Sequence, residues 1–130
     1  MSTLQTIVVA YDDPESRTLT RAADLAQSLK AALIVTNVVS ADRESPESIS
    51  EYGQERLDQA RAYLAERGLE AELVPTSGQP ADAIVALAEE RNADLIVVGM
   101  RRKGFFERLV EGSVAQDVMR RATCDVLAVH

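Results

Sequence analysis

Glycine, serine and basic residues gather in one segment near the end of the chain. Gly99 closes an apolar run and is followed by the basic residues 101–103, while Gly112-Ser113 precedes a helical pattern. Glycine just past a strand lets backbone amides approach a ligand closely. Gly-Ser at a helix start offers unpaired N–H groups, a hydroxyl and the positive end of the helix dipole. Together these features predict a site for an anion such as a triphosphate.

An acidic pair, Asp12 and Asp13, follows the first apolar run. Two carboxylates could bind a divalent ion, but Asp13 before Pro14 is interpreted as a helix N-cap, with Pro14 as the first helical residue. His130 is the last residue and has no serine or cysteine partner indicated by spacing. One cysteine, Cys124, and one histidine are too few for a zinc cage. We therefore assign no catalytic residue and no metal site.

Short β-rich runs alternate with helical patterns along the whole chain. Strands are expected at Thr6–Ala10, 33–39, 71–74, 94–99 and Asp125–Val129. Pro75 restricts the third strand to an edge or an end of the sheet. Helices are expected from Pro14, over 49–64 with Gly68 at the C-terminus, from Pro80, and behind Gly112-Ser113. Residues 40–48 are polar and contain Pro46, so a loop is expected there.

This strict alternation predicts an α/β fold, an open five-stranded parallel sheet with helices on both faces. A chain of 130 residues with 46% apolar residues is enough for one core, so residues 1–130 are expected to form a single domain. Ligands of such sheets bind beyond the carboxyl ends of strands, where the strand order reverses direction. Function is therefore expected at Tyr11-Asp12, Val38-Val39, Thr76 and Gly99-Met100.

The chain resembles the universal stress protein family, and the resemblance covers nearly its whole length. It lies in the opening residues 7–12, the Gly78-Gln79-Pro80 step, the 94–99 strand, the Gly112-Ser113-Val114-Ala115 helix start and the closing residues 124–129. ATP-binding members of the family carry G-x-x-G-x9-G-[S/T] after the fourth strand, and the separation of Gly99 from Gly112 matches that motif. The resemblance implies an adenine nucleotide alpha hydrolase-like sheet with strand order 3-2-1-4-5. In that order the ends of strands one and four lie side by side.

The resemblance also implies which residues meet a nucleotide. It puts Ala10, Tyr11 and Asp12 beside the adenine, with Val38 in apolar contact from the end of the second strand. The residues that would hold ribose and phosphates are Gly99, Gly112, Ser113 and Val114.

Arg102 departs from the family motif, because it stands where the second glycine is expected. A non-glycine residue disfavours positive φ and its side chain takes up space, which favours a protein that has lost ATP. Alternatively, Arg101, Arg102 and Lys103 supply charge-assisted bonds to the phosphates. Two functions therefore stay open. One is an ATP-binding stress-response or signalling module, with Mg if ATP binds and at most slow ATPase activity; the other is a dimeric interaction protein without ATP.

A phosphoacceptor receiver domain is the alternative from another class, since it has similar length, alternation and an acidic pair after its first strand. Two positions speak against it. The third strand ends in Val74-Pro75-Thr76 with no aspartate to phosphorylate, and no lysine follows the last strand.

Charge and composition limit the partners. The net charge of −7, from 21 acidic and 14 basic residues, disfavours nucleic acid and anionic membrane surfaces. No apolar run approaches the roughly 20 residues that span a bilayer, and the first residues lack the regions of a signal peptide, so a cytoplasmic location is expected. The strand Asp125–Val129 would be an apolar sheet edge, and exposed edges tend to be paired. A homodimer through this edge is expected, as the resemblance also implies.

Overall fold

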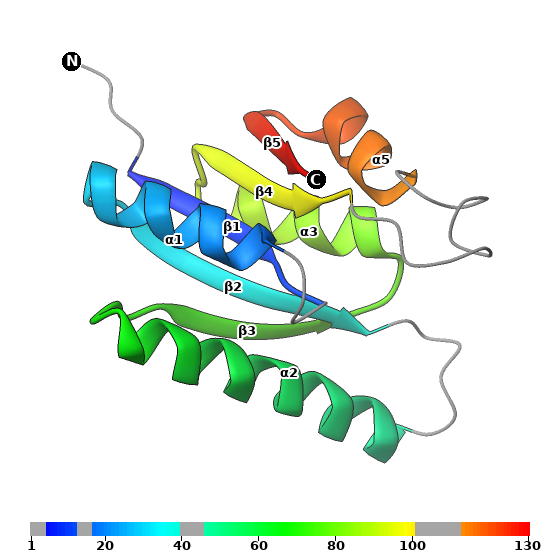
Figure 1. The fold of residues 1–130 in the computed structure, drawn as a ribbon. Helices are drawn as coiled ribbons and strands as arrows, with labels where there is room; N and C mark the ends of the chain where they lie inside the picture. The colour runs from blue at the N-terminus through cyan, green and yellow to red at the C-terminus, as the bar shows by residue number, and fades with distance from the viewer. Residues whose placement is uncertain (1–4, 13–16, 40–45, 101–112) are drawn as a thin grey trace.

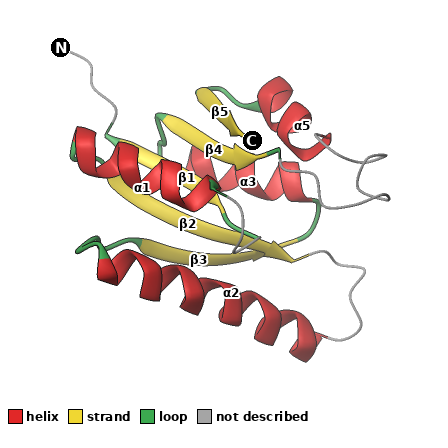
Figure 2. Ribbon diagram, in the orientation of Figure 1, coloured by secondary structure: helices red, strands yellow, loops and turns green. Residues whose placement is uncertain are grey.

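The computed structural model describes residues 5–12, 17–39, 46–100 and 113–130. Strands and helices alternate along these residues (Figure 1, Figure 2). The elements are β1 (Thr6–Ala10), α1 (Thr18–Leu29), β2 (Ala32–Val39), α2 (Pro46–Glu66), β3 (Glu72–Ser77), α3 (Pro80–Glu90), β4 (Leu95–Gly99), α5 (Ser113–Arg121) and β5 (Asp125–Val129). All strand pairs are parallel and the order is β3-β2-β1-β4-β5. The predicted fold class and strand order are confirmed.

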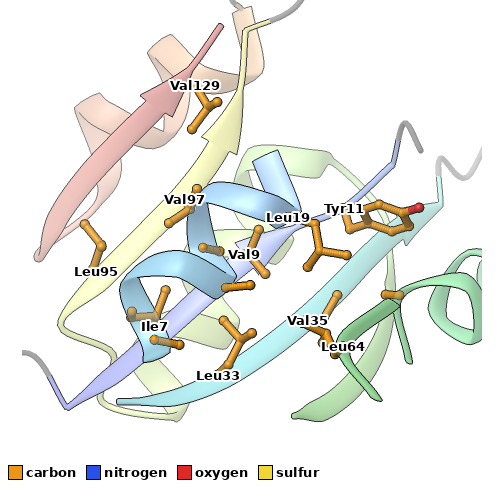
Figure 3. Packing of buried hydrophobic residues seen from close by; sticks show 14 of the residues in the cluster. Ile7, Val9, Tyr11, Leu19, Leu33, Val35, Leu64, Leu95, Val97 and Val129 are labelled. Atoms are coloured by element: carbon orange, nitrogen blue, oxygen red, sulfur yellow. The ribbon is translucent and has the colours of Figure 1, made fainter. Parts of the chain in front are cut away.

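Both faces of the sheet are covered by helices. Successive strand residues point to opposite faces, so Ile7 and Val9 of β1 pack against α1 and α2, while Val8 between them packs against α3 and α5. Figure 3 shows the first of these two clusters, in which Val9, Val35 and Val97 of three neighbouring strands lie in the interior. Ile7, Val8 and Val9 are completely buried. Coverage on both sides explains why β1 is a continuous apolar run rather than an alternating one.

Two helix starts differ from the sequence prediction. The predicted start of the first helix at Pro14 is wrong, because α1 begins at Thr18 with Arg17 at its N-cap position and no side-chain cap bond. Its first two residues, Thr18 and Leu19, are already buried, so packing stabilises this start of the helix. Asp13 and Pro14 themselves lie outside the described residues. The helix α2 begins at Pro46, inside the predicted loop, since proline is compatible with a first helical turn that needs no N–H there.

Pro75 lies within β3, which extends to Ser77 instead of ending at Val74. The N–H of Gly78 donates to the carbonyl of Val39 on β2 at 3.1 Å. Alternate residues of a strand direct their backbone groups to the same side, so Thr76 also faces β2 and Pro75 faces away from it. The missing N–H of Pro75 therefore falls on the outer side of an edge strand, where no ladder partner is needed.

Other local predictions are confirmed. Gly68 has the left-handed φ of +74° that a residue behind a helix C-terminus requires. The helix α3 begins at Pro80, and the side-chain oxygen of Gln79 accepts the N–H of Asp82 at 2.8 Å as its N-cap.

Candidate functional site

The ends of β1 and β4 lie side by side. Their parallel register pairs Val9 with Val97, which brings the end of β1 at Ala10 next to the end of β4 at Gly99. From β1 the sheet continues to β2 and β3 on one side and to β4 and β5 on the other. The strand order thus reverses direction here, and the carboxyl ends of the strands form one edge of the molecule (Figure 1). Such a switch point is where open parallel sheets bind ligands.

Tyr11 contributes its backbone to this edge and its side chain to the core. Its N–H donates to the carbonyl of Thr36 at 2.8 Å, which continues the β1–β2 ladder one step past β1. The ring is only 6% exposed and packs in the cluster of α1 and α2, at the end of the row of side chains in Figure 3. Its hydroxyl donates to Oε1 of Gln59 on α2 at 3.5 Å. Asp12, the next residue, is exposed at the edge.

Val38 presents backbone groups to the space beyond β1. In a parallel ladder the next bond after Tyr11 N–H to Thr36 would run from the N–H of Val38 to the carbonyl of Tyr11. No such backbone bond forms among the described residues; the Tyr11 carbonyl instead accepts Nδ2 of Asn37 at 2.7 Å. Because Thr36 faces β1, Val38 two residues later faces the same side with both its N–H and its C=O. The sequence prediction assigned Val38 only an apolar contact; the backbone pair was missed because it depends on register.

Gly99 is required by packing as well as by its place in the motif. A Cβ at Gly99 would lie 2.7 Å from Oγ1 of Thr18, the first residue of α1. Real side chains essentially never show such a contact, so a side chain at residue 99 would force Thr18 or the backbone to shift. The guanidinium of Arg17 lies at the same edge and donates to the carbonyl of His130 at 3.4 Å. Neither Arg17 nor Thr18 was predicted to be near the site, since no local motif marks them.

The helix α5 brings its first residues to this edge. Ser113 and Val114 open the helix, and Val114 packs against the cluster of α3 and α5 together with Ala10 and Val38. Its N-terminus carries the partial positive charge of a helix start. The structure therefore brings together Ala10, Tyr11, Asp12, Val38, Gly99, Ser113 and Val114. Three predicted site residues, Arg101, Arg102 and Gly112, lie outside the described residues.

A cavity of about 360 Å³ opens at the other end of the sheet, where the strands begin, between α3 and the turn before β5. It is lined by Val85, Ala88, Glu89, Asn92, Ala93, Ile96, Ala122, Thr123 and Cys124. Burial, with Asp125 and Asp94 nearby, raises the pKa of the Cys124 thiol, which therefore stays protonated and unreactive near neutral pH. We do not take this cavity as the functional site in place of the edge where β1 and β4 end. Its ionisable side chains form no paired or metal-ligating cluster.

The described residues contain neither a metal-ligating cluster nor a membrane-spanning helix. Within residues 5–12, 17–39, 46–100 and 113–130, no group of three or more His, Cys, Asp or Glu side chains could hold a metal ion. No helix in the same part of the chain is long and apolar enough to cross a bilayer.

Comparison with protein families identifies what the chain is similar to. The sequence model described as "Universal stress protein family" matches residues 3–130. Universal stress protein Rv1636 of Mycobacterium tuberculosis is 35% identical over 145 aligned residues, which cover 100% of this chain and 99% of that protein. Universal stress protein MJ0531 of Methanocaldococcus jannaschii is 41% identical over 83 residues, and universal stress protein YxiE of Bacillus subtilis is 35% identical over 82. These two alignments span only 49% and 55% of the relatives' own lengths.

Two similar solved structures are nucleotide complexes. A universal stress protein in complex with cAMP superposes with a TM-score of 0.80 at 33% identity, covering 99% of both chains. The universal stress protein from Archaeoglobus fulgidus in complex with dAMP superposes with a TM-score of 0.79 at 30% identity, covering 99% of this chain and 100% of that one.

Proposed function

The chain belongs to the universal stress protein family, and on that premise we propose that it binds an adenine nucleotide where β1 and β4 end. Binding changes its conformation or its partners, as in a stress-response or signalling module. We assign this edge no catalytic residue.

The backbone pair of Val38 is the observation that carries this proposal. The Watson–Crick edge of adenine offers one acceptor, N1, beside one donor, the 6-amino group. The N–H and C=O of Val38 point to the β1 side of β2, one step past the last backbone bond between the two strands, and offer the complementary donor and acceptor. The side chains of Ala10 and Val38 lie on the same face of the sheet and supply apolar surface to the base.

The phosphate end would lie between Gly99 and the start of α5. The N-terminus of a helix binds anions through its free N–H groups and dipole. Arg17 adds a cation at this edge, and the two solved relatives, in complex with cAMP and dAMP, support a monophosphate ligand. ATP with Mg is the second candidate, favoured by the spacing of Gly99 and Gly112.

Calorimetric titration of the full chain tests the proposal. We expect saturable binding of AMP, cAMP or ATP and no saturable binding of GTP, which presents an acceptor where adenine presents its amino group. The titrations with ATP are run with and without Mg. No saturable signal from any adenine nucleotide at millimolar concentration would overturn the proposal.

Substitution of Arg102 tests which of the two ligand classes the site prefers. We expect Arg102→Gly to raise the affinity for ATP relative to AMP about tenfold, because the strain of a non-glycine residue at such a loop position is of order 1–3 kcal/mol and about 1.4 kcal/mol is tenfold. Arg101→Gly is the matched control, since it removes the same charge without restoring the motif glycine. A fall in ATP affinity in both variants would show instead that the arginines bind the phosphates by charge.

We further propose a homodimer through the edge of β5. Among the described strands β5 has a neighbour, β4, on one side only. Its residues after Asp125 are uncharged, and Leu127 is 36% exposed. The other edge strand, β3, carries Pro75 with its missing N–H on the outer side, so it is the poorer edge for pairing.

A further inference from the structure

We propose that Asn37 is a positioning residue for the base: its side-chain amide replaces the Val38 N–H as donor to Tyr11 and so keeps the Val38 backbone pair open for adenine. This inference rests on the proposed function, and it concerns a residue on the face of β2 opposite to the side chain of Val38.

Asn37 is an unusual residue for its surroundings. It lies within β2 with none of its surface exposed, in a strand whose other buried residues are mostly apolar. Its Nδ2 donates to the Tyr11 carbonyl at 2.7 Å, but its Oδ1 is buried and has no hydrogen-bond partner among the described residues. An unsatisfied buried acceptor destabilises a fold. An apolar β-branched residue would suit this strand better, so stability does not explain the asparagine.

The ladder between β1 and β2 explains it. After the bond from the Tyr11 N–H to the Thr36 carbonyl, the next bond of a regular parallel ladder runs to the Tyr11 carbonyl. Its donor in a regular ladder is the N–H of Val38. Asn37 supplies the donor from its side chain instead. The Tyr11 carbonyl is thus satisfied while the N–H of Val38 is left for another acceptor. Since a trans peptide directs its C=O and the following N–H in opposite directions, the same bond also sets the direction of the Asp12 N–H.

The helix α2 keeps the Asn37 side chain in place. A Cβ at Gly53 of α2 would lie 3.2 Å from Cγ2 of Val39 and 3.6 Å from Oδ1 of Asn37, so the helix backbone passes directly over the amide. The buried ring of Tyr11 and its bond to Gln59 hold the acceptor from the same helix. A donor and acceptor fixed by surrounding packing form a preorganised arrangement, as a binding site requires.

Asn37→Val tests this role with two measurements. In the variant the Val38 N–H can close onto the Tyr11 carbonyl and lengthen the ladder. Without ligand, we expect the backbone amide hydrogen of Val38 to exchange with solvent at least tenfold more slowly in the variant than in the wild type. We also expect AMP to bind at least tenfold more weakly, with the preference for AMP over IMP falling toward one. Stability should be unchanged or higher, the opposite of what loss of a structural residue would cause.

Thr36→Val is the matched control. Thr36 is also fully buried in β2. Its hydroxyl lies 3.1 Å from that of Thr76, on the face of the sheet opposite to the Asn37 side chain. The change therefore removes a part-buried polar contact and leaves the bond from Asn37 to the Tyr11 carbonyl in place. We expect this control to retain the preference for AMP over IMP. If Asn37→Val does not fold, Asn37→Ser removes the amide but keeps a small polar side chain, and the same two measurements apply.

The outcomes separate the two proposals. An Asn37 variant that binds AMP with wild-type affinity and preference, or whose Val38 amide exchanges as in the wild type, would overturn the positioning role alone. A wild-type protein that binds no adenine nucleotide would overturn the proposed function and this role with it.

Discussion

Gly99 illustrates how one residue serves two requirements. The motif spacing marks it as a residue that lets a ligand approach, and the structure adds that Thr18 at the start of α1 occupies the space a side chain would need. The glycine therefore couples the position of α1 to the end of β4. A substitution here acts on the fold even without a ligand.

A double-mutant cycle tests this packing at the residue scale. We expect Gly99→Ala to lower the free energy of unfolding by about 1–3 kcal/mol, the usual range for overpacking. The same change in a Thr18→Ala background should be clearly less destabilising, because Oγ1, the atom 2.7 Å from the added Cβ, is then absent. Urea unfolding of the four proteins measures both effects. Equal losses in the two backgrounds would contradict the proposed contact.

The two edge strands differ in what they offer a partner. Met100 N–H donates to the carbonyl of Val129 at 2.7 Å, so Val129 and, by alternation, Leu127 face β4 with their backbone groups. Val126 and Ala128 then face outward with N–H and C=O groups that a second copy can pair with. The outer side of β3 lacks one such donor at Pro75.

Ala128→Pro tests the proposed dimer at the scale of this element. Proline at this position removes an outward N–H without removing a bond to β4, so the fold should persist while the dimer is lost. We expect sedimentation velocity at micromolar concentrations to show a dimer for the wild type and a monomer for the variant. Met119→Lys is a control that changes another exposed apolar side chain, 46% exposed on α5, away from the edge. The same mass for wild type and Ala128→Pro would contradict the proposed interface.

The molecule as a whole has two unlike edges. At the carboxyl ends of the strands lie the backbone groups of Val38, the start of α5 and Arg17. At the amino ends lie a cavity and the part-buried thiol of Cys124. Burial, helped by Asp125 and Asp94, raises the pKa of this thiol in the folded state. The thiol is therefore a reporter of folding at the edge remote from the proposed site.

The sign of the resulting pH dependence follows from linkage. A thiol whose pKa is higher folded than unfolded loses its proton first in the unfolded chain, whose ordinary cysteine pKa is about 8.5. The thiol contributes its full stabilisation below the unfolded pKa. This contribution is lost as the pH rises from the unfolded pKa to the higher folded pKa. We expect urea unfolding at pH 7 and pH 10 to show a larger loss for wild type than for Cys124→Ala, and equal losses would contradict the raised pKa. Other titrating groups affect both proteins alike, so the difference isolates this thiol.

The order of elements and the family were determined by sequence alone, because β-branched runs such as Thr6–Ala10 and helical spacing are local patterns that burial on both faces of a sheet imposes. The same patterns located the switch-point edge and Gly99. The start of α1 at Thr18, the helical start at Pro46 and the outward direction of Pro75 were decided by packing and strand pairing. Only tertiary structure could place Thr18 against Gly99, or direct the Asn37 amide to the Tyr11 carbonyl in place of the Val38 N–H. These relations join residues distant in sequence through strand register, which local propensities do not encode.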